Sequence, residues 1–159
     1  MGLNGTSGLY QTIAGYMDRA ERPYQCLAED GLMITEIEGA EGPWRVFIQV
    51  TDDEELHRVA IHGHLPTRIP ACNGQKVAEL LTRINYELII GNFELNLNDG
   101  HALFKTSLDL ADGKLTRAMF ERMYELNARA MKDYSQQIMS VAYDAPTPLK
   151  RGQRDQVGC

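Results

Sequence analysis

Residues 77–110 have the pattern of an amphipathic helix that runs into a β-hairpin, and this stretch constrains the fold more than any other part of the chain. Its first half spaces apolar residues at i, i+3, i+4, i+7 and i+11, which gathers them on one face of an α-helix. These residues are Val77, Leu80, Leu81, Ile84 and Leu88. Asn73 stands where an N-cap would accept an amide proton of the first turn, and Asn85 suits the left-handed conformation that ends a helix. We therefore expect a helix after Asn73 with one side packed on a sheet.

The second half of this stretch is the hairpin. Asp99-Gly100 favours a two-residue type I′ turn, because glycine adopts positive φ freely and aspartate does so more readily than most residues. Such a turn would pair Leu97 with Ala102, Leu95 with Phe104 and Phe93 with Thr106, all on one side of the ribbon. The other side then carries polar residues and faces water.

The rest of the chain supplies four more strands and two more helices. A helix is expected from Ser7 until shortly before Pro23, and strands 24–28 and 32–38 flank a second turn at Asp30-Gly31. Residues 44–50 and 56–65 alternate apolar with other residues, as half-buried strands do. The longest helix is expected after Thr116, its N-cap. This order, α-β-β-β-β-α-β-β-α, predicts an α+β fold with helices on one face of an antiparallel sheet.

The run from residue 80 to 110 resembles the central motif of the YbjN family, bacterial proteins described as sensory transduction regulators. The matching features are Asn85-Tyr86, Gly91-Asn92-Phe93, the Asp99-Gly100 turn and Ser107-Leu108. The resemblance covers most of residues 8 to 142. It implies the fold of type III secretion chaperones and a homodimer, and it provides no catalytic residues. Residues 8–143 would form this domain, with a flexible N-terminus at 1–7 and a flexible basic tail at 144–159.

Charge and composition exclude several classes of function. The formal net charge is −6, and the basic residues Lys150, Arg151 and Arg154 lie in the tail, so the folded part is more acidic still. An acidic body repels phosphate backbones and anionic lipid headgroups, which argues against nucleic-acid and membrane partners. The chain lacks a signal-peptide pattern and any apolar run of the roughly 20 residues that a membrane span needs.

The cysteines point to a reducing compartment. Cys26, Cys72 and Cys159 are widely separated and form no CxxC pair. An odd number of cysteines without secretory context favours free thiols in a cytoplasmic protein. None of the three has a recognisable catalytic base beside it in the sequence, so a cysteine nucleophile is disfavoured.

His62 and His64 are the strongest candidates for metal or acid-base chemistry. They alternate with Gly63 on one expected strand, so their imidazoles project from the same face about 7 Å apart. A metal site needs a third ligand, and His57 falls on the opposite face. We therefore expect no metal, cofactor or catalytic residue, and we read the pair as part of a solvent-facing strand; a metal-binding or enzymatic protein that adds a distant ligand to His62 and His64 is the alternative.

Two other patterns also favour ordinary structure. The acidic run 52–55 offers oxygen ligands for a divalent cation, but it lacks the ligand spacing and the glycine of an EF-hand loop. The glycines at 39 and 42 precede a strand rather than a helix, so they do not form a phosphate-binding loop. A solvated connection and a plain turn are expected.

The last helix carries the candidate interaction residues. A seam with alternating spacings of four and three contains one polar member, Asn127, which could set the register of a helix pair or could be a satisfied amide of the protomer's own core. Methionine-rich helix surfaces occur in adaptable peptide-binding grooves. The expected partner or dimer surface consists of Met119, Met123, Asn127, Met131, Tyr134 and Met139.

These observations favour a non-enzymatic protein-binding module, regulatory or chaperone-like, that acts as a dimer on a segment of another protein. Besides the metal-binding or enzymatic alternative, a purely structural dimer without a client remains open. The identity of the partner is not encoded in any motif of the chain.

Overall fold

The computed structural model describes residues 8–39, 42–111 and 114–143. The expected flexible segments at 1–7 and 144–159 lie outside these residues. The elements are α1 (Gly8–Arg19), β1 (Tyr24–Leu27), the 3₁₀ helix η1 (Ala28–Asp30), β2 (Leu32–Ile37), β3 (Trp44–Asp52), β4 (His57–His64), η2 (Ala71–Asn73), α2 (Gly74–Glu87), β5 (Asn92–Asn96), β6 (His101–Asp109) and α3 (Arg117–Ala142). This is the expected order, with two short 3₁₀ turns added.

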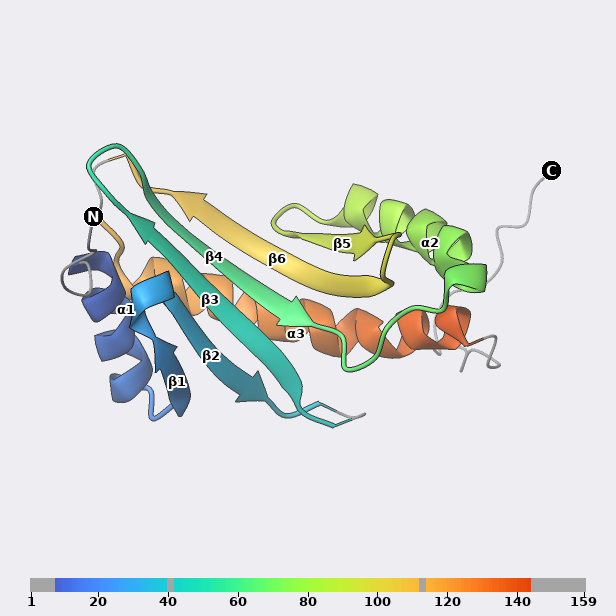
Figure 1. The fold of residues 1–159 in the computed structure, drawn as a ribbon, viewed down its shortest axis with the longest axis horizontal. Helices are drawn as coiled ribbons and strands as arrows, with labels where there is room; N and C mark the ends of the chain where they lie inside the picture. The colour runs from blue at the N-terminus through green and yellow to red at the C-terminus, as the bar shows by residue number, and fades with distance from the viewer. Residues whose placement is uncertain (1–7, 40–41, 112–113, 144–159) are drawn as a thin grey trace.

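The strands form one antiparallel sheet of six strands in the order β1-β2-β3-β4-β6-β5. The three helices cover one face of it, and α3 runs along the sheet from the end near α1 to the end near α2 (Figure 1). In β3 every second residue from Trp44 to Val50 is buried, as the alternation predicted. The predicted α+β fold, with helices on one face of an antiparallel sheet, is therefore confirmed.

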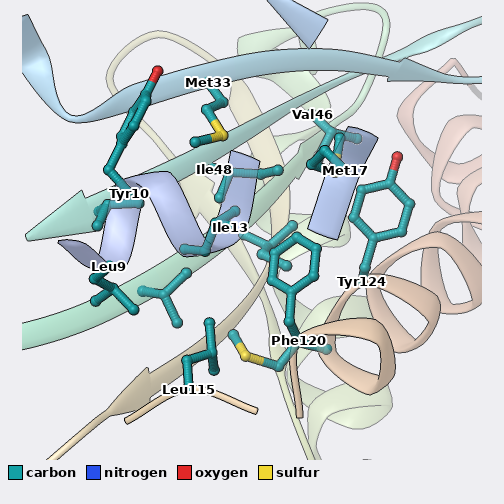
Figure 2. Packing of buried hydrophobic residues seen from close by; sticks show 14 of the residues in the cluster. Leu9, Tyr10, Ile13, Met17, Met33, Val46, Ile48, Leu115, Phe120 and Tyr124 are labelled. Carbon is teal, nitrogen blue, oxygen red and sulfur yellow. The ribbon is translucent and has the colours of Figure 1, made fainter. Parts of the chain in front are cut away.

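The core between sheet and helices consists of two clusters of buried side chains. In the first, Ile13 and Met17 of α1 pack against Ile48 of the sheet and against Phe120 and Tyr124 of α3 (Figure 2). The second lies at the other end of α3 and contains residues of α2, β5 and β6. Because α3 contributes to both clusters, it joins the two ends of the sheet.

The start of α3 is as predicted. The Thr116 hydroxyl accepts a hydrogen bond from the Met119 amide at 3.2 Å, which makes Thr116 the N-cap. Leu115 and Phe120, on either side of the cap, are both buried. This is the arrangement of a hydrophobic staple, which sets the direction in which the chain enters the helix.

The predicted register of the β5–β6 hairpin is wrong by two residues. Phe93 lies opposite Phe104 rather than Thr106, and residues 97–100 form a four-residue turn. Side chains close this turn: Asn96 accepts a hydrogen bond from the Asn98 amide, and Asp99 accepts one from the His101 amide. A shift of two residues keeps every side chain on its predicted face, since side chains alternate with a period of two.

The ends of α2 also differ from the prediction. Asn73 occupies the N-cap position, but its side chain makes no capping bond and donates instead to the Ala142 carbonyl oxygen at 2.9 Å, which ties α2 to the end of α3. Asn85 does not end the helix, because α2 continues to Glu87. Its side chain binds the backbone of β5, as described below.

Candidate functional site

The face of the sheet opposite the helices, here called the open face, is the first candidate surface. Strand register fixes which side chains share it, because they alternate with the buried ones. One row across the strands runs Glu36, Arg45, His64 and Leu103, and the next runs Ile34, Phe47, His62 and Lys105. Most of these side chains are half-buried against one another.

Part of the open face is apolar. The outer face of an antiparallel sheet is usually polar. Here Leu27, Leu32, Ile34, Phe47 and Leu103 all project from it, and Leu27 on the edge strand β1 is 45% exposed. Apolar side chains on a sheet face that no described helix covers favour a macromolecular contact.

A histidine pair is a closely packed polar feature of the open face. Nδ1 of His64 lies 2.6 Å from Nε2 of His101, so one nitrogen donates to the other. The His64 ring also packs against the Phe47 ring in a tilted arrangement, with ring centroids 4.6 Å apart and ring planes at 59°. His62 is 6.3 Å from His64, centroid to centroid.

Burial and neighbouring charges shift the ionisable groups of this face. Desolvation, followed by the nearby His101 and His62, lowers the pKa of His64 to about 4. Desolvation and Lys105 also lower the pKa of His62. Burial alone would raise the pKa of Glu94, but hydrogen bonds from Lys105 and Asn92 outweigh it and hold the pKa below its ordinary value. His62 and His64 are therefore neutral at pH 7.

Among the described residues, no third ligand joins His62 and His64 to form the metal site of the alternative hypothesis. His101, not a carboxylate or thiol, meets His64, and across residues 8–39, 42–111 and 114–143 no three side chains of His, Cys, Asp or Glu converge as a metal site. His57 lies on the opposite face, as predicted, and pairs with Asp52 at 2.6 Å. Asp52 also accepts a hydrogen bond from the Leu9 amide at the start of α1, so the acidic run is partly structural rather than wholly solvated.

The expected interaction residues of α3 differ in how far they are exposed. Met123, Asn127 and Met131 are buried within the protomer, Tyr134 and Met139 are half-buried against the second core cluster, and Met119 is 37% exposed. Met123, Asn127 and Met131 are thus part of the protomer's own core, and the expected partner or dimer surface on α3 stays a prediction. Contacts of α3 with the sheet, α1 and α2 bury these three side chains within the protomer.

Asn127 belongs to the protomer's own core. Its Nδ2 donates to the carbonyl oxygens of Ile61 at 2.9 Å and Phe104 at 3.0 Å, on the adjacent strands β4 and β6. Of the two roles left open by the sequence, the core amide is thus the one observed, although Oδ1 is buried without a hydrogen-bond partner among the described residues.

The turn between α2 and β5 is a second candidate surface, which the sequence analysis missed. Tyr86 is 91% exposed, Ile89 98% and Ile90 53%. The turn is held firmly: Asn85 donates to the Phe93 carbonyl oxygen at 2.9 Å and accepts from the Phe93 amide at 2.7 Å. We call Tyr86, Ile89 and Ile90 the apolar turn. The sequence does hold a sign of this surface: Tyr86, Ile89 and Ile90 are apolar but do not follow the spacing of the helix face that packs on the sheet.

His101 and Arg45 were also missed, for a different reason. Nothing local marks either residue. His101 reaches His64 only because β6 pairs with β4. In the chain these two strands are separated by α2 and β5.

The comparisons with known proteins agree with this fold. The model of the YbjN family, described as "Putative bacterial sensory transduction regulator", matches residues 10–139. The chain belongs to the YbjN family. No curated protein sequence matches it significantly.

Two solved structures share the YbjN-family fold of this chain. A crystal structure of the ExsC–ExsE complex superposes with a TM-score of 0.60 at 18% sequence identity, and covers 87% of this chain and 97% of that one. The crystal structure of YbjN from E. coli superposes with a TM-score of 0.56 at 13% identity, and covers 89% of this chain and 92% of that one. At these identities the likeness establishes the fold.

No described helix is long and apolar enough to cross a membrane.

Proposed function

We propose that this protein is a cytoplasmic, non-enzymatic binding module of regulatory or chaperone-like type, which dimerises and holds a segment of another protein. The observation that carries this proposal is the pair of apolar surfaces: the apolar turn and the apolar part of the open face. Membership of the YbjN family and the likeness to ExsC, which was crystallised with ExsE, support a role in protein binding.

The apolar turn is proposed as the contact between two copies. It lies next to β5, which is an edge strand of the sheet. An edge strand presents unpaired backbone groups and readily pairs with another chain. Burial of an isoleucine or tyrosine side chain contributes about 1.5–3 kcal/mol, so the three side chains of each copy supply a substantial part of an interface.

The open face is proposed as the surface for the client segment. It lies at the opposite side of the sheet from the helices and extends to the second edge strand, β1. A peptide in extended conformation can lie along such a face and place alternate side chains on Leu27, Ile34 and Phe47.

Light scattering after size-exclusion chromatography tests the dimer. The wild-type protein is expected to be dimeric, and Ile89→Glu monomeric, because the substitution buries a charge in the interface. Leu27→Glu, an equally apolar-to-acidic change at an exposed position of β1, the edge strand at the other side of the sheet from β5, is the matched control and should remain dimeric. A monomeric wild-type protein, or an Ile89→Glu dimer as stable as the control, would rule out this interface.

Site-specific photo-crosslinking in the native host tests the client. A photoreactive residue at Gln49, on the open face, is expected to capture a second protein, whereas the same residue at the exposed Glu125 of α3 should not. Equal labelling from both positions, or labelling only of the sister subunit, contradicts the client surface. The second result would support the purely structural dimer, which also predicts that a hydrophobic dye does not bind the intact dimer.

Metal analysis of the purified protein separates the remaining alternative. The proposal predicts no stoichiometric metal, in wild type and in His62→Ala alike. A bound metal that is lost in His62→Ala would favour the metal-binding reading instead.

A further inference from the structure

A hollow of about 490 Å³ lies at one end of the open face, where β2, β3, β4 and β6 come together. Its lining combines an aromatic ring, Phe47, and the apolar wall of Pro66 with the histidine pair and the guanidinium group of Arg45.

The histidine pair has one hydrogen-bond donor that the contact between the two rings does not use. The contact between Nδ1 of His64 and Nε2 of His101 uses one nitrogen of each ring. A neutral imidazole carries one N–H and one acceptor nitrogen, so in either tautomer the pair keeps one free N–H and one free acceptor. Neither remaining nitrogen has a hydrogen bond to a described residue.

Arg45 supplies the positive charge. Its side chain is exposed and forms no ion pair within the described part of the chain, whereas Arg58, on the same face, is bound to Asp109 at 2.8 Å. A guanidinium group offers a planar set of donors that matches a carboxylate. A donor set of this kind beside Phe47 suits a carboxylate that carries an apolar group.

We propose that this hollow binds an acidic side chain of the client segment, with Arg45 and the free N–H of the histidine pair as donors and Phe47 as the apolar contact. The inference rests on the proposed function, because it assigns a chemical requirement to the segment that the open face would hold. The net negative charge of the protein repels an acidic client segment from the rest of its surface. Recognition of the acidic side chain would therefore depend on this hollow.

Glu36 makes the proposal sharper. It lies directly across from Arg45 in the pairing of β2 with β3, at the rim of the hollow. A carboxylate there opposes an incoming acidic side chain and competes for Arg45. Loss of the Glu36 charge should therefore strengthen binding, whereas loss of the Arg45 charge should weaken it.

The test uses the full-length protein and two peptides, Ac-Thr-Leu-Glu-Leu-Thr-NH₂ and its Gln analogue, with NMR detection of the His64 and His101 ring signals. The Glu peptide is expected to shift these signals and to bind more tightly than the Gln peptide. Arg45→Gln should weaken binding of the Glu peptide about tenfold, the equivalent of one charge-assisted hydrogen bond. Glu36→Gln should tighten it, and Arg58→Gln, the matched control on the same face, should leave it unchanged.

Three results would overturn the proposal: equal binding of both peptides, an effect of Arg58→Gln as large as that of Arg45→Gln, or binding of phenylacetate without binding of the Glu peptide. The last result would assign the hollow to a small free acid. Because the peptides report on the hollow itself, a negative result here is distinguishable from failure of the dimer or crosslinking experiments.

Discussion

The side-chain amide of Asn127 lies directly over Gly63, where α3 crosses the middle of the sheet. A Cβ atom at residue 63 would overlap with Oδ1 of Asn127 and would press against Cγ of Met131 at 3.0 Å. The glycine therefore leaves the space that lets the Asn127 amide reach the carbonyl oxygens of Ile61 and Phe104. This contact sets how closely the long helix approaches the sheet.

Gly63→Ala should lower the free energy of unfolding by about 1–3 kcal/mol, because overpacking a closely packed core forces neighbouring atoms to move. Urea denaturation measures the change. Gly15→Ala is the control: its Cβ would meet only the flexible end of Arg19, at 3.7 Å, and removal of a glycine from a helix interior should stabilise by about 0.5–1 kcal/mol. Equal effects at both sites would show that the packing at Gly63 is looser than described.

Asn127→Ala should destabilise the protein by about 1–3 kcal/mol, because two buried carbonyl oxygens lose a hydrogen-bond donor. The subunit number should not change, since the side chain faces the protomer's own sheet. Denaturation and light scattering on the same variant give the two readouts. A shift in oligomeric state without loss of stability would instead favour a role in helix pairing between subunits.

Asn85→Ala should loosen the apolar turn. The Phe93 amide loses its hydrogen-bond acceptor and should exchange with solvent at least about tenfold faster, which corresponds to about 1.4 kcal/mol. Hydrogen exchange followed by NMR measures this rate. Thr82→Ala, on the exposed side of the same helix, removes only a bond to the Ala78 carbonyl oxygen and should leave the Phe93 rate unchanged.

His64 should make the protein less stable as the pH falls. Its pKa is about 4 in the folded protein, below the ordinary 6.5, so the unfolded chain binds the proton more readily. The neutral form is therefore favoured by folding, and stability declines as the pH drops from about 6.5 toward 4. His64→Gln should remove about 1–2 kcal/mol of this decline, a figure reduced for partial exposure. Denaturation of both proteins at pH 7.5 and 4.5 checks it, and identical slopes would contradict the burial of this histidine.

Local patterns in the sequence were sufficient to predict the helices and strands and which side of each is buried. The alternation from Trp44 to Val50, the N-cap at Thr116 and the polarity of the β5–β6 hairpin all follow from interactions between residues close in the chain, where sterics and hydrogen bonding act over a few residues. For the same reason the family resemblance could be recognised from a run of about thirty residues.

Only the tertiary structure decided the contacts between distant segments. The hairpin register depended on the side chains of Asn96 and Asp99. The position of Asn127 depended on the space left by Gly63. The contact between His64 and His101 depended on the pairing of β4 with β6. The burial of Met123 and Met131 likewise required the placement of α3 against the sheet and the other helices. Periodicity states which side of a helix is apolar, but how much of that side is covered depends on the elements that pack against it.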